Sequence, residues 1–186
     1  MKRVLEYVAV VAAAVLVALA VQAWVVKPYR IPSGSMLDTL RPGDRVLVNR
    51  MVYHLREPER GDVIVFHYPQ DPDVVFIKRV VGVPGDLLEA RDGRLYVNGR
   101  RAAEPYVHRT GGRLDPTLAQ AAIAGSTMHD PWSLAKPYRV PAGNYFVMGD
   151  NRTDSDDSRD WGTVPRAAIV GEGLATYWPV SRLRAL

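Results

Sequence analysis

The sequence predicts a mainly β protein, in which one N-terminal transmembrane helix is followed by an antiparallel β-sheet domain. Three observations lead to this fold class. An apolar run covers residues 8–26, and beyond it short runs of Val, Ile, Phe and Tyr are separated by Gly, Pro and Asp. The pairs Asp92-Gly93 and Asn98-Gly99 are typical of β-hairpin turns. We expect a short tail at 1–7, the apolar helix at 8–26 and the β domain at 27–186.

The apolar run is long enough to cross a membrane. About 20 residues at ~1.5 Å rise each span a hydrocarbon core of ~30 Å. Tyr7 at one end, and Trp24 and Tyr29 at the other, lie where interfacial aromatic side chains gather. We therefore expect a membrane anchor.

The charges around the run bear on its orientation. Lys2 and Arg3 precede it and favour a cytoplasmic N-terminus, whereas Lys27 and Arg30 follow it and weaken that bias. With the N-terminus inside, everything after Lys27 lies outside the cytoplasm.

Two other interpretations of the run compete with an anchor. A cleavable secretion signal would explain the small residues of Ala18-Leu19-Ala20 and Val21-Gln22-Ala23, but the run is longer than a usual signal core. A buried helix of a soluble protein would keep a polar stripe, and this run has none.

The bulk composition fits one anchor and one packed domain. The chain has 186 residues, of which 47% are hydrophobic and 24% charged, as in globular proteins. Its net charge of +4 is spread along the chain rather than blocked, so we expect no nucleic-acid partner and a solvated basic surface facing anionic lipid. The absence of cysteine excludes disulfides, a thiol nucleophile and a cysteine zinc site.

Seven segments beyond the apolar run are predicted strands because they are rich in β-branched and aromatic residues. They are residues 45–53, 62–68, 74–83, 86–90, 94–98, 144–148 and 168–178. Residues 110–137 differ, with Gly111-Gly112, an Ala-rich stretch at 118–124 and Pro131. We predict that this segment is an excursion from the core with one short helix.

A candidate nucleophile follows the apolar run, in the segment Pro-Ser-Gly-Ser-Met at 32–36. Pro and Gly around Ser35 favour a turn that presents its hydroxyl and its backbone N–H together. Acyl transfer needs both a nucleophile and an oxyanion donor. Alone the pattern is weak, since Gly-Ser-Thr-Met at 125–128 resembles it.

A lysine interrupts the predicted apolar strand at 74–83. Alternation puts Lys78 on the side of Phe76 and Val80, with Arg79 on the opposite side, so one of the two cations should face a buried or special environment. A desolvated lysine is a usable base. Lowering its pKa from about 10.4 to about 8 costs about 3 kcal/mol.

A carboxylate-rich segment at 149–162 invites a calcium interpretation, but its register does not fit. Counting from Asp150, Arg152 occupies the third position of an EF-hand loop and Trp161 the last. We expect no metal, and we expect the interleaved Asp and Arg side chains to form ion pairs that hold a loop around Ser155.

These segments, in this order behind one apolar run, resemble the bacterial type I signal peptidases, also called leader peptidases, which use a Ser/Lys dyad. The matching motifs are P-S-G-S-M at 32–36, K-R-V-V-G-V-P-G-D at 78–86 and G-D-N-R-x-x-S-x-D-S-R-x-W-G at 149–162. The resemblance covers most of the chain except 110–137. It implies a catalytic β domain of the signal peptidase type, with paired antiparallel sheets and no cofactor.

The resemblance also implies an activity and a location. The chain would be a membrane-bound serine endopeptidase that removes N-terminal signal peptides from exported preproteins, cleaving after small residues in an Ala-x-Ala pattern. Its partners would be preprotein signal peptides, the lipid bilayer and the export machinery. It would lie in the plasma membrane as a single-pass protein, with the catalytic domain outside the cytoplasm.

Residue by residue, the resemblance assigns Ser35 as the nucleophile and Lys78 as the general base. The Ser33 hydroxyl and the Ser35 N–H would form the oxyanion hole, and Ser155 would orient Lys78. The loop would be braced by Asp150, Asp157 and Arg159, and the substrate pockets would be lined by Ile31, Met36, Leu40, Phe76 and Ile77. Alternation lets Phe76 and Ile77 share a pocket only if their strand is bulged.

One departure from the family pattern P-S-G-S-M-x-P-T-L is visible, because Asp38 stands where Pro is frequent. The change removes no catalytic group. Ser35 lies nine positions beyond Val26, a stretch that reaches about 30 Å when extended. The site must therefore lie near the outer face of the membrane.

Three alternatives stay open. A Ser/His/Asp triad would need a histidine in a site-forming segment, and none of His54, His67, His108 and His129 lies in one. A related Ser/Lys enzyme is possible, either a peptidase dedicated to one substrate or a self-cleaving repressor, although a repressor would carry a helix-turn-helix. A catalytically inactive, membrane-tethered binding module would be expected to have lost Ser35 or Lys78.

Overall fold

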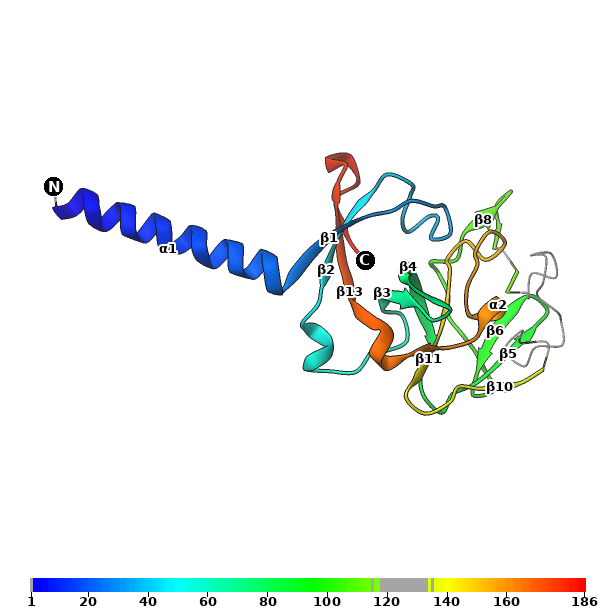
Figure 1. The fold of residues 1–186 in the computed structure, drawn as a ribbon. Coiled ribbons are helices and arrows are strands. Elements are labelled where there is room, and N and C mark those ends of the chain that lie inside the picture. The colour runs from blue at the N-terminus through cyan, green and yellow to red at the C-terminus, as the bar shows by residue number, and fades with distance from the viewer. Residues whose placement is uncertain (1, 115, 118–133, 135) are drawn as a thin grey trace.

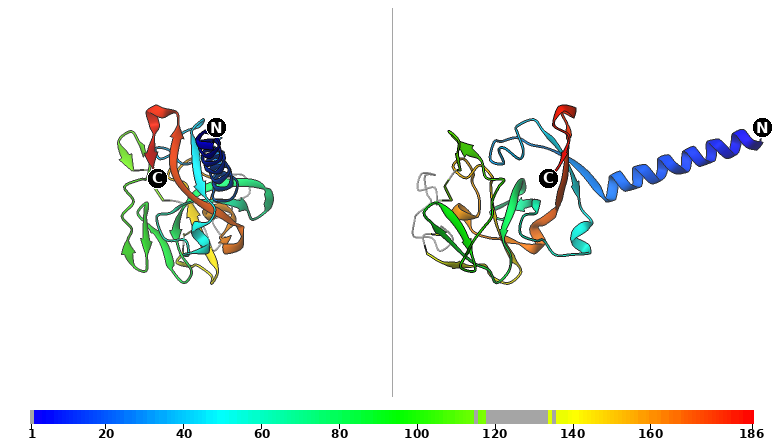
Figure 2. Two further views of the ribbon diagram at one scale, coloured as in Figure 1. Left: turned by 90° about the vertical axis from the view of Figure 1, so that its left-hand side faces the viewer. Right: turned by 180° about the vertical axis from the view of Figure 1, so that it is seen from behind.

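The structure, a computed structural model, describes residues 2–114, 116–117, 134 and 136–186. Helix α1 (Lys2–Trp24, 23 residues) covers most of the predicted apolar run, and Figures 1 and 2 show it projecting from the β domain. Within the described residues, no helix combines the length and the hydropathy that a membrane crossing requires.

The β domain is built on an eight-stranded antiparallel sheet, which holds five of the predicted strands. The strands run in the order β1-β2-β13-β3-β4-β11-β12, and β14 pairs with β13. Their bounds are β1 Val26–Arg30, β2 Arg45–Asn49, β3 Val63–Tyr68, β4 Asp71–Gly82, β11 Asn144–Met148, β12 Val164–Pro165, β13 Ile169–Trp178 and β14 Arg184–Ala185.

A second antiparallel sheet has the order β10-β5-β6-β7 and holds the other two predicted strands. Both predicted turns are confirmed, because φ is positive at Asp92 and Gly93 between β5 and β6, and at Asn98 and Gly99 between β6 and β7. The bounds are β5 Leu87–Arg91, β6 Arg94–Val97, β7 Arg100–Arg101 and β10 Tyr138–Arg139, and a separate pair joins β8 Arg109–Thr110 to β9 Arg113–Leu114.

Two local features differ from the predicted strands. The strand expected at 45–53 stops at Asn49, because the Asn49 side chain accepts hydrogen bonds from the N–H groups of Met51 (2.9 Å) and Val52 (3.1 Å) and turns the chain into the short helix η1 (Val52–His54). Strand β1 was not predicted. It contains Pro28, which is tolerated because β1 lies at the edge of its sheet.

Hydrophobic clusters pack against both faces of the large sheet, as the alternating side chains of strand β3 illustrate. Successive side chains point to opposite faces, so Ile64 and Phe66 pack into one cluster while Val63 and Val65 pack into another. A third cluster fills the space around the smaller sheet and contains Val81, Leu88, Leu95, Val97, Leu134, Val140, Phe146 and Met148.

Residues 110–137 contribute more to the core than the sequence predicted. Thr117 and Leu134 are each 1% exposed, and Leu134 belongs to the third cluster. The expectation that this segment lies wholly outside the core is therefore wrong. The short helix predicted near 118–124 lies outside the described residues.

Candidate active site

The turn between β1 and β2 and the strand β4 bring Ser35 and Lys78 together. We call residues 32–40 the nucleophile turn; its base is closed by a hydrogen bond from the Ile31 N–H to the Asp44 carbonyl (2.9 Å). Lys78 Nζ lies 2.6 Å from Ser35 Oγ. Both residues are buried, with 5% and 9% of their surface exposed, so their contact is largely shielded from water.

The surroundings of Lys78 favour its neutral form. Lys78 and Phe76 share one face of β4, and Nζ lies 5.5 Å from the centre of the Phe76 ring. Burial lowers the pKa of Lys78 below its ordinary value, and the negative charges of Asp157 and Asp156 offset only part of this effect. A neutral lysine in contact with a serine hydroxyl can accept its proton.

The candidate oxyanion donors lie in the nucleophile turn. Ser33 Oγ is 3.4 Å from Ser35 Oγ. In the described part of the chain, no hydrogen bond uses the Ser35 N–H, so this donor is available. Asn151 fixes the turn, because its N–H donates to the Ser35 carbonyl (3.0 Å) and its Nδ2 donates to the Gly34 carbonyl (3.1 Å).

The segment 149–162, here called the Asp/Arg loop, packs directly against the nucleophile turn. At Gly149 a Cβ atom would lie 2.2 Å from Ser155 Oγ and 2.4 Å from the Ser35 carbonyl oxygen, so only glycine fits. Ser155, expected to orient Lys78, donates its hydroxyl hydrogen to Asp157 Oδ2 (2.8 Å). Its oxygen can therefore offer Lys78 only lone pairs.

Asp157 and Arg159 form a fully buried ion pair that shapes the Asp/Arg loop. Arg159 Nη2 lies 2.8 Å from Asp157 Oδ2, and both side chains are at most 1% exposed. Burial alone would raise the pKa of Asp157, but the charge and hydrogen bonds of Arg159 bring it below its usual range. Asp157 also caps the helix α2 (Ser158–Trp161) in a capping box with Asp160.

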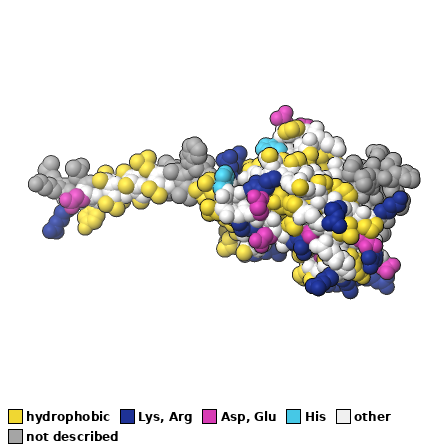
Figure 3. All heavy atoms as spheres, turned by 90° about the horizontal axis from the view of Figure 1, so that it is seen from below, with side chains coloured by type: hydrophobic (Ala, Val, Ile, Leu, Met, Phe, Trp, Pro, Cys, Tyr) yellow, Lys and Arg dark blue, Asp and Glu magenta, His cyan; other side chains and the backbone are white. Residues whose placement is uncertain are grey.

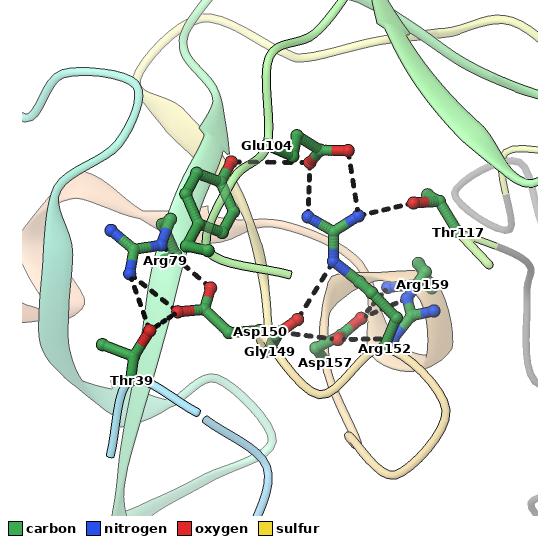
Figure 4. A network of polar contacts seen from close by, with 10 residues as sticks. Thr39, Arg79, Glu104, Thr117, Gly149, Asp150, Arg152, Asp157 and Arg159 are labelled. Carbon is green, nitrogen blue, oxygen red and sulfur yellow. Dashed lines mark hydrogen bonds and ion pairs between the residues drawn. The ribbon is translucent and has the colours of Figure 1, made fainter. Parts of the chain in front are cut away.

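A second network ties the nucleophile turn, β4 and the Asp/Arg loop together (Figure 4). Arg79, on the opposite face of β4 from Lys78, grips Asp150 through Nε (2.9 Å) and Nη2 (2.7 Å). Thr39 Oγ1 donates to the same carboxylate at 2.5 Å. The ring of Tyr106 lies 4.1 Å from the Arg79 guanidinium. Lys78 and Arg79 therefore both face buried partners, whereas the sequence predicted a buried environment for only one of these two cations.

A third set of contacts holds the backbone of the Asp/Arg loop from the other side (Figure 4). Arg152 Nε donates to the Gly149 carbonyl (3.1 Å), and its Nη1 donates to Thr117 Oγ1 (2.5 Å). Its Nη2 forms an ion pair with Glu104. The roles of Glu104 and Thr117 were not predicted, because both lie in segments whose sequence shows no pattern. Two carboxylates of the loop, those of Asp150 and Asp157, thus form ion pairs with arginines.

The expected pocket residues fall on two faces of the sheet. Ile31, Met36 and Leu40 lie in one buried cluster at 2%, 0% and 0% exposure, and Ile77 packs against it. Phe76 packs against the cluster on the other face. The β3–β4 register is regular through both Phe76 and Ile77, so these two side chains diverge.

Two described histidines, His67 and His108, have hydrogen-bond partners other than Ser35, and the third, His54, is exposed. His67 Nδ1 lies 2.6 Å from the Pro72 carbonyl oxygen, and His108 Nδ1 lies 3.0 Å from Asp38 Oδ2 on the nucleophile turn. His129 lies outside the described residues. The basic side chain at hydrogen-bond distance from the Ser35 hydroxyl is a lysine, which favours a dyad over a histidine triad.

Comparison with known proteins finds relatives along most of the chain. The profile of the family described as "Signal peptidase, peptidase S26" matches residues 4–178. Signal peptidase I of Pseudomonas aeruginosa is 38% identical over 91% of this chain and 72% of that protein. Signal peptidase IB of Staphylococcus aureus is 36% identical over 98% of this chain and 94% of that protein. A crystal structure of a signal peptidase I from Enterococcus faecalis gives a TM-score of 0.44 at 31% identity, over 63% of this chain and 97% of that chain.

Proposed function

The chain belongs to the peptidase S26 family of signal peptidases, and we propose that it removes signal peptides from preproteins with Ser35 as nucleophile and Lys78 as general base. As a member of this family it is a serine endopeptidase. One observation carries the assignment of the dyad: the 2.6 Å contact between Lys78 Nζ and Ser35 Oγ in a buried site. It joins the hydroxyl of a turn to a lysine whose pKa is lowered by burial.

Acylation begins with proton transfer. Neutral Lys78 takes the proton of the Ser35 hydroxyl, and the alkoxide attacks the scissile carbonyl carbon. The Ser35 N–H and the Ser33 hydroxyl stabilise the negative charge on the carbonyl oxygen, by about 3 kcal/mol for each well-placed donor. The lysine ammonium then gives its proton to the leaving amine, which departs as the N-terminus of the mature protein.

Deacylation repeats the same proton transfers with water as the nucleophile. Neutral Lys78 takes a proton from a water molecule, which attacks the ester between Ser35 and the signal peptide. The bond to Ser35 Oγ breaks, Lys78 returns the proton to that oxygen, and the signal peptide leaves with a free carboxylate. In this scheme the Asp/Arg loop keeps Lys78 in place throughout, through the nearby charge of Asp157, which Ser155 in turn contacts.

We propose cleavage after small residues, in an Ala-x-Ala pattern. The support comes from the tight apolar packing next to Ser35, where Met36 and Leu40 are fully buried and Ile31 nearly so. A well-packed wall leaves room for a methyl group and penalises larger side chains. Ile77 packs against this wall and is assigned to the pocket. Phe76, on the other face, is assigned to covering Lys78.

We propose that α1 anchors the enzyme in the plasma membrane with its N-terminus in the cytoplasm. Support comes from the apolar run itself and from the exposed apolar side chains of the helix, among them Val10 and Leu16, both 67% exposed. Only a short strand, β1, separates α1 from the nucleophile turn. An anchored enzyme would therefore hold Ser35 close to the bilayer, where an exported preprotein and its export machinery also lie.

Cleavage of a preprotein panel tests the proposal. The full chain in detergent should cut several unrelated preproteins after Ala-x-Ala, whereas Ser35→Ala and Lys78→Met should lose at least about a thousandfold in kcat/KM. Mass spectrometry of the products identifies the cleaved bond. Cleavage of a single preprotein would point to a dedicated processing peptidase, and no cleavage by the wild type to a binding module. Activity in Lys78→Met would exclude the dyad.

A further inference from the structure

A groove of about 960 Å³ lies beside the end of helix α1. None of the residues of the nucleophile turn lines this groove. Its lining includes Lys27 of β1, Arg50 directly after β2, and Val75 of β4. The Arg50 N–H donates to the carbonyl of Val25, one residue past α1, at 2.8 Å. The groove is thus built onto the junction between helix and β domain.

The groove is positively charged and contains no acidic lining residue in the described chain. Besides Lys27 and Arg50 it is lined by the imidazoles of His54 and His67. Neither Lys27 nor Arg50 forms an ion pair with any described acidic residue, unlike the buried arginines of the active site. Figure 3 shows Lys, Arg and His side chains together on the part of the β domain next to α1. Unpaired cations in a concave site attract an anion.

The apolar residues of the lining indicate which kind of anion would fit the groove. Met51 and Val75 line the groove and are 43% and 37% exposed, and Ile169 and Tyr29 complete its apolar surface. A ligand that fits both the cationic and the apolar residues of the lining carries a negative group next to a hydrocarbon chain. A signal peptide does not fit this description, because its N-terminal end is basic and would be repelled.

We propose that this groove binds the phosphate of an anionic phospholipid headgroup, with Lys27 and Arg50 on the phosphate and Met51 and Val75 against the glycerol and upper acyl chain. The proposal rests on the proposed membrane anchor, because α1 would bring the groove to the level of the headgroups. Each cationic side chain at a membrane surface strengthens binding about fivefold, so two should contribute about 30-fold.

The test uses the full chain released from mixed micelles of neutral phosphatidylcholine and anionic phosphatidylglycerol, with bound lipids counted by native mass spectrometry. The wild type should retain phosphatidylglycerol in preference to phosphatidylcholine. Lys27→Gln/Arg50→Gln should lose this preference about 30-fold, whereas Lys27→Arg/Arg50→Lys should keep it. The matched control Arg100→Gln/Arg101→Gln removes the two exposed arginines of β7, which line a different cavity, and should bind like the wild type.

Three results would overturn the proposal. Equal loss in the groove variant and in the control would mean that net charge alone attracts the lipid, and no loss in either would mean that the lipid binds elsewhere. Displacement of the lipid by millimolar inorganic phosphate would make the groove a site for simple anions. Cleavage of a short soluble signal-peptide substrate is measured in parallel. If the wild type fails to cleave it, the proposed function falls while the lipid result still stands.

Discussion

At the scale of single residues, Lys78 combines two properties that oppose each other. Its burial makes it useful as a base, because the neutral form dominates at a lower pH than for a lysine in water. The same burial makes the charged form costly to the folded protein. Stability and activity should therefore respond in opposite directions to its removal.

Replacing Lys78 with Met should abolish activity and raise the free energy of unfolding at neutral pH by about 1–2 kcal/mol. The pKa of Lys78 is lower in the folded than in the unfolded chain, so the unfolded chain binds more protons and wild-type stability rises with pH. The gain from Lys78→Met should accordingly vanish as pH rises through 10.5, the ordinary value for lysine. Urea titrations across this pH range measure it. A gain that grows towards alkaline pH would contradict the account.

A second residue-scale prediction concerns Asp156, whose negative charge raises the pKa of Lys78. Asp156→Asn should lower that pKa, so kcat/KM should reach its plateau at a lower pH and rise about twofold at neutral pH. The measurement is the pH profile of kcat/KM on a soluble peptide. Asp73→Asn, a matched change at the exposed start of β4, should leave the profile where it is. A shift of the Asp156→Asn profile to higher pH would refute the electrostatic argument.

At the scale of elements, the site depends on how the Asp/Arg loop is held between other segments. Arg79 and Thr39 hold the Asp150 side chain, while Arg152 holds the Gly149 carbonyl. The loop is therefore fixed on two sides, and Gly149 at its start packs too closely against the Ser35 carbonyl to allow movement there. Loss of the contacts on either side should therefore disturb the geometry of Ser35 and Lys78.

Thr117→Val removes the hydroxyl that accepts from Arg152 and leaves a buried guanidinium N–H without this partner. We expect the free energy of unfolding to fall by about 1–3 kcal/mol and kcat to fall with little change in KM. Thr117→Ser keeps the hydroxyl and should retain most of the wild-type free energy of unfolding and most of the wild-type kcat. Thermal melts and steady-state kinetics of the two variants provide the comparison. A loss in Thr117→Ser with none in Thr117→Val would show that the methyl group, not the hydrogen bond, matters.

At the scale of the whole molecule, α1 and the β domain are energetically separate. The described apolar side chains of the helix are exposed, and Figures 1 and 2 show no second layer packed along it. The clusters of the core draw their members from the β domain. The described part of the helix therefore contributes little to the folding of the β domain.

Removing residues 1–24 should change the free energy of unfolding of the β domain by less than about 1 kcal/mol, because no described side chain of α1 belongs to a core cluster. The truncated enzyme should cleave a short soluble peptide at the rate of the full chain, yet process a preprotein inserted in vesicles at least about tenfold more slowly. Chemical denaturation and the two cleavage assays test this. A large loss of stability would show that α1 belongs to the folded domain.

The β part of the fold class was predicted well from the sequence, because its signals are local. Strand periodicity and the Asp-Gly and Asn-Gly turns depend on neighbouring residues, and the antiparallel sheets follow from them. Strand ends were less predictable, since Asn49 stops β2 through a side-chain contact. Glu104 and Thr117 could not be assigned from sequence, because their role exists only where two distant segments meet at Arg152.

The parts of the site lie far apart along the chain. This separation determines when the site can form during synthesis. Asn151, which fixes the carbonyls of the nucleophile turn, is 117 positions from Gly34 in sequence. While the ribosome is still making the β domain, Ser35 has neither its base in place nor its loop to hold it. The dyad therefore cannot be held in its final geometry before the Asp/Arg loop has been made. A truncated product of interrupted translation would remain harmless to the nascent proteins around it.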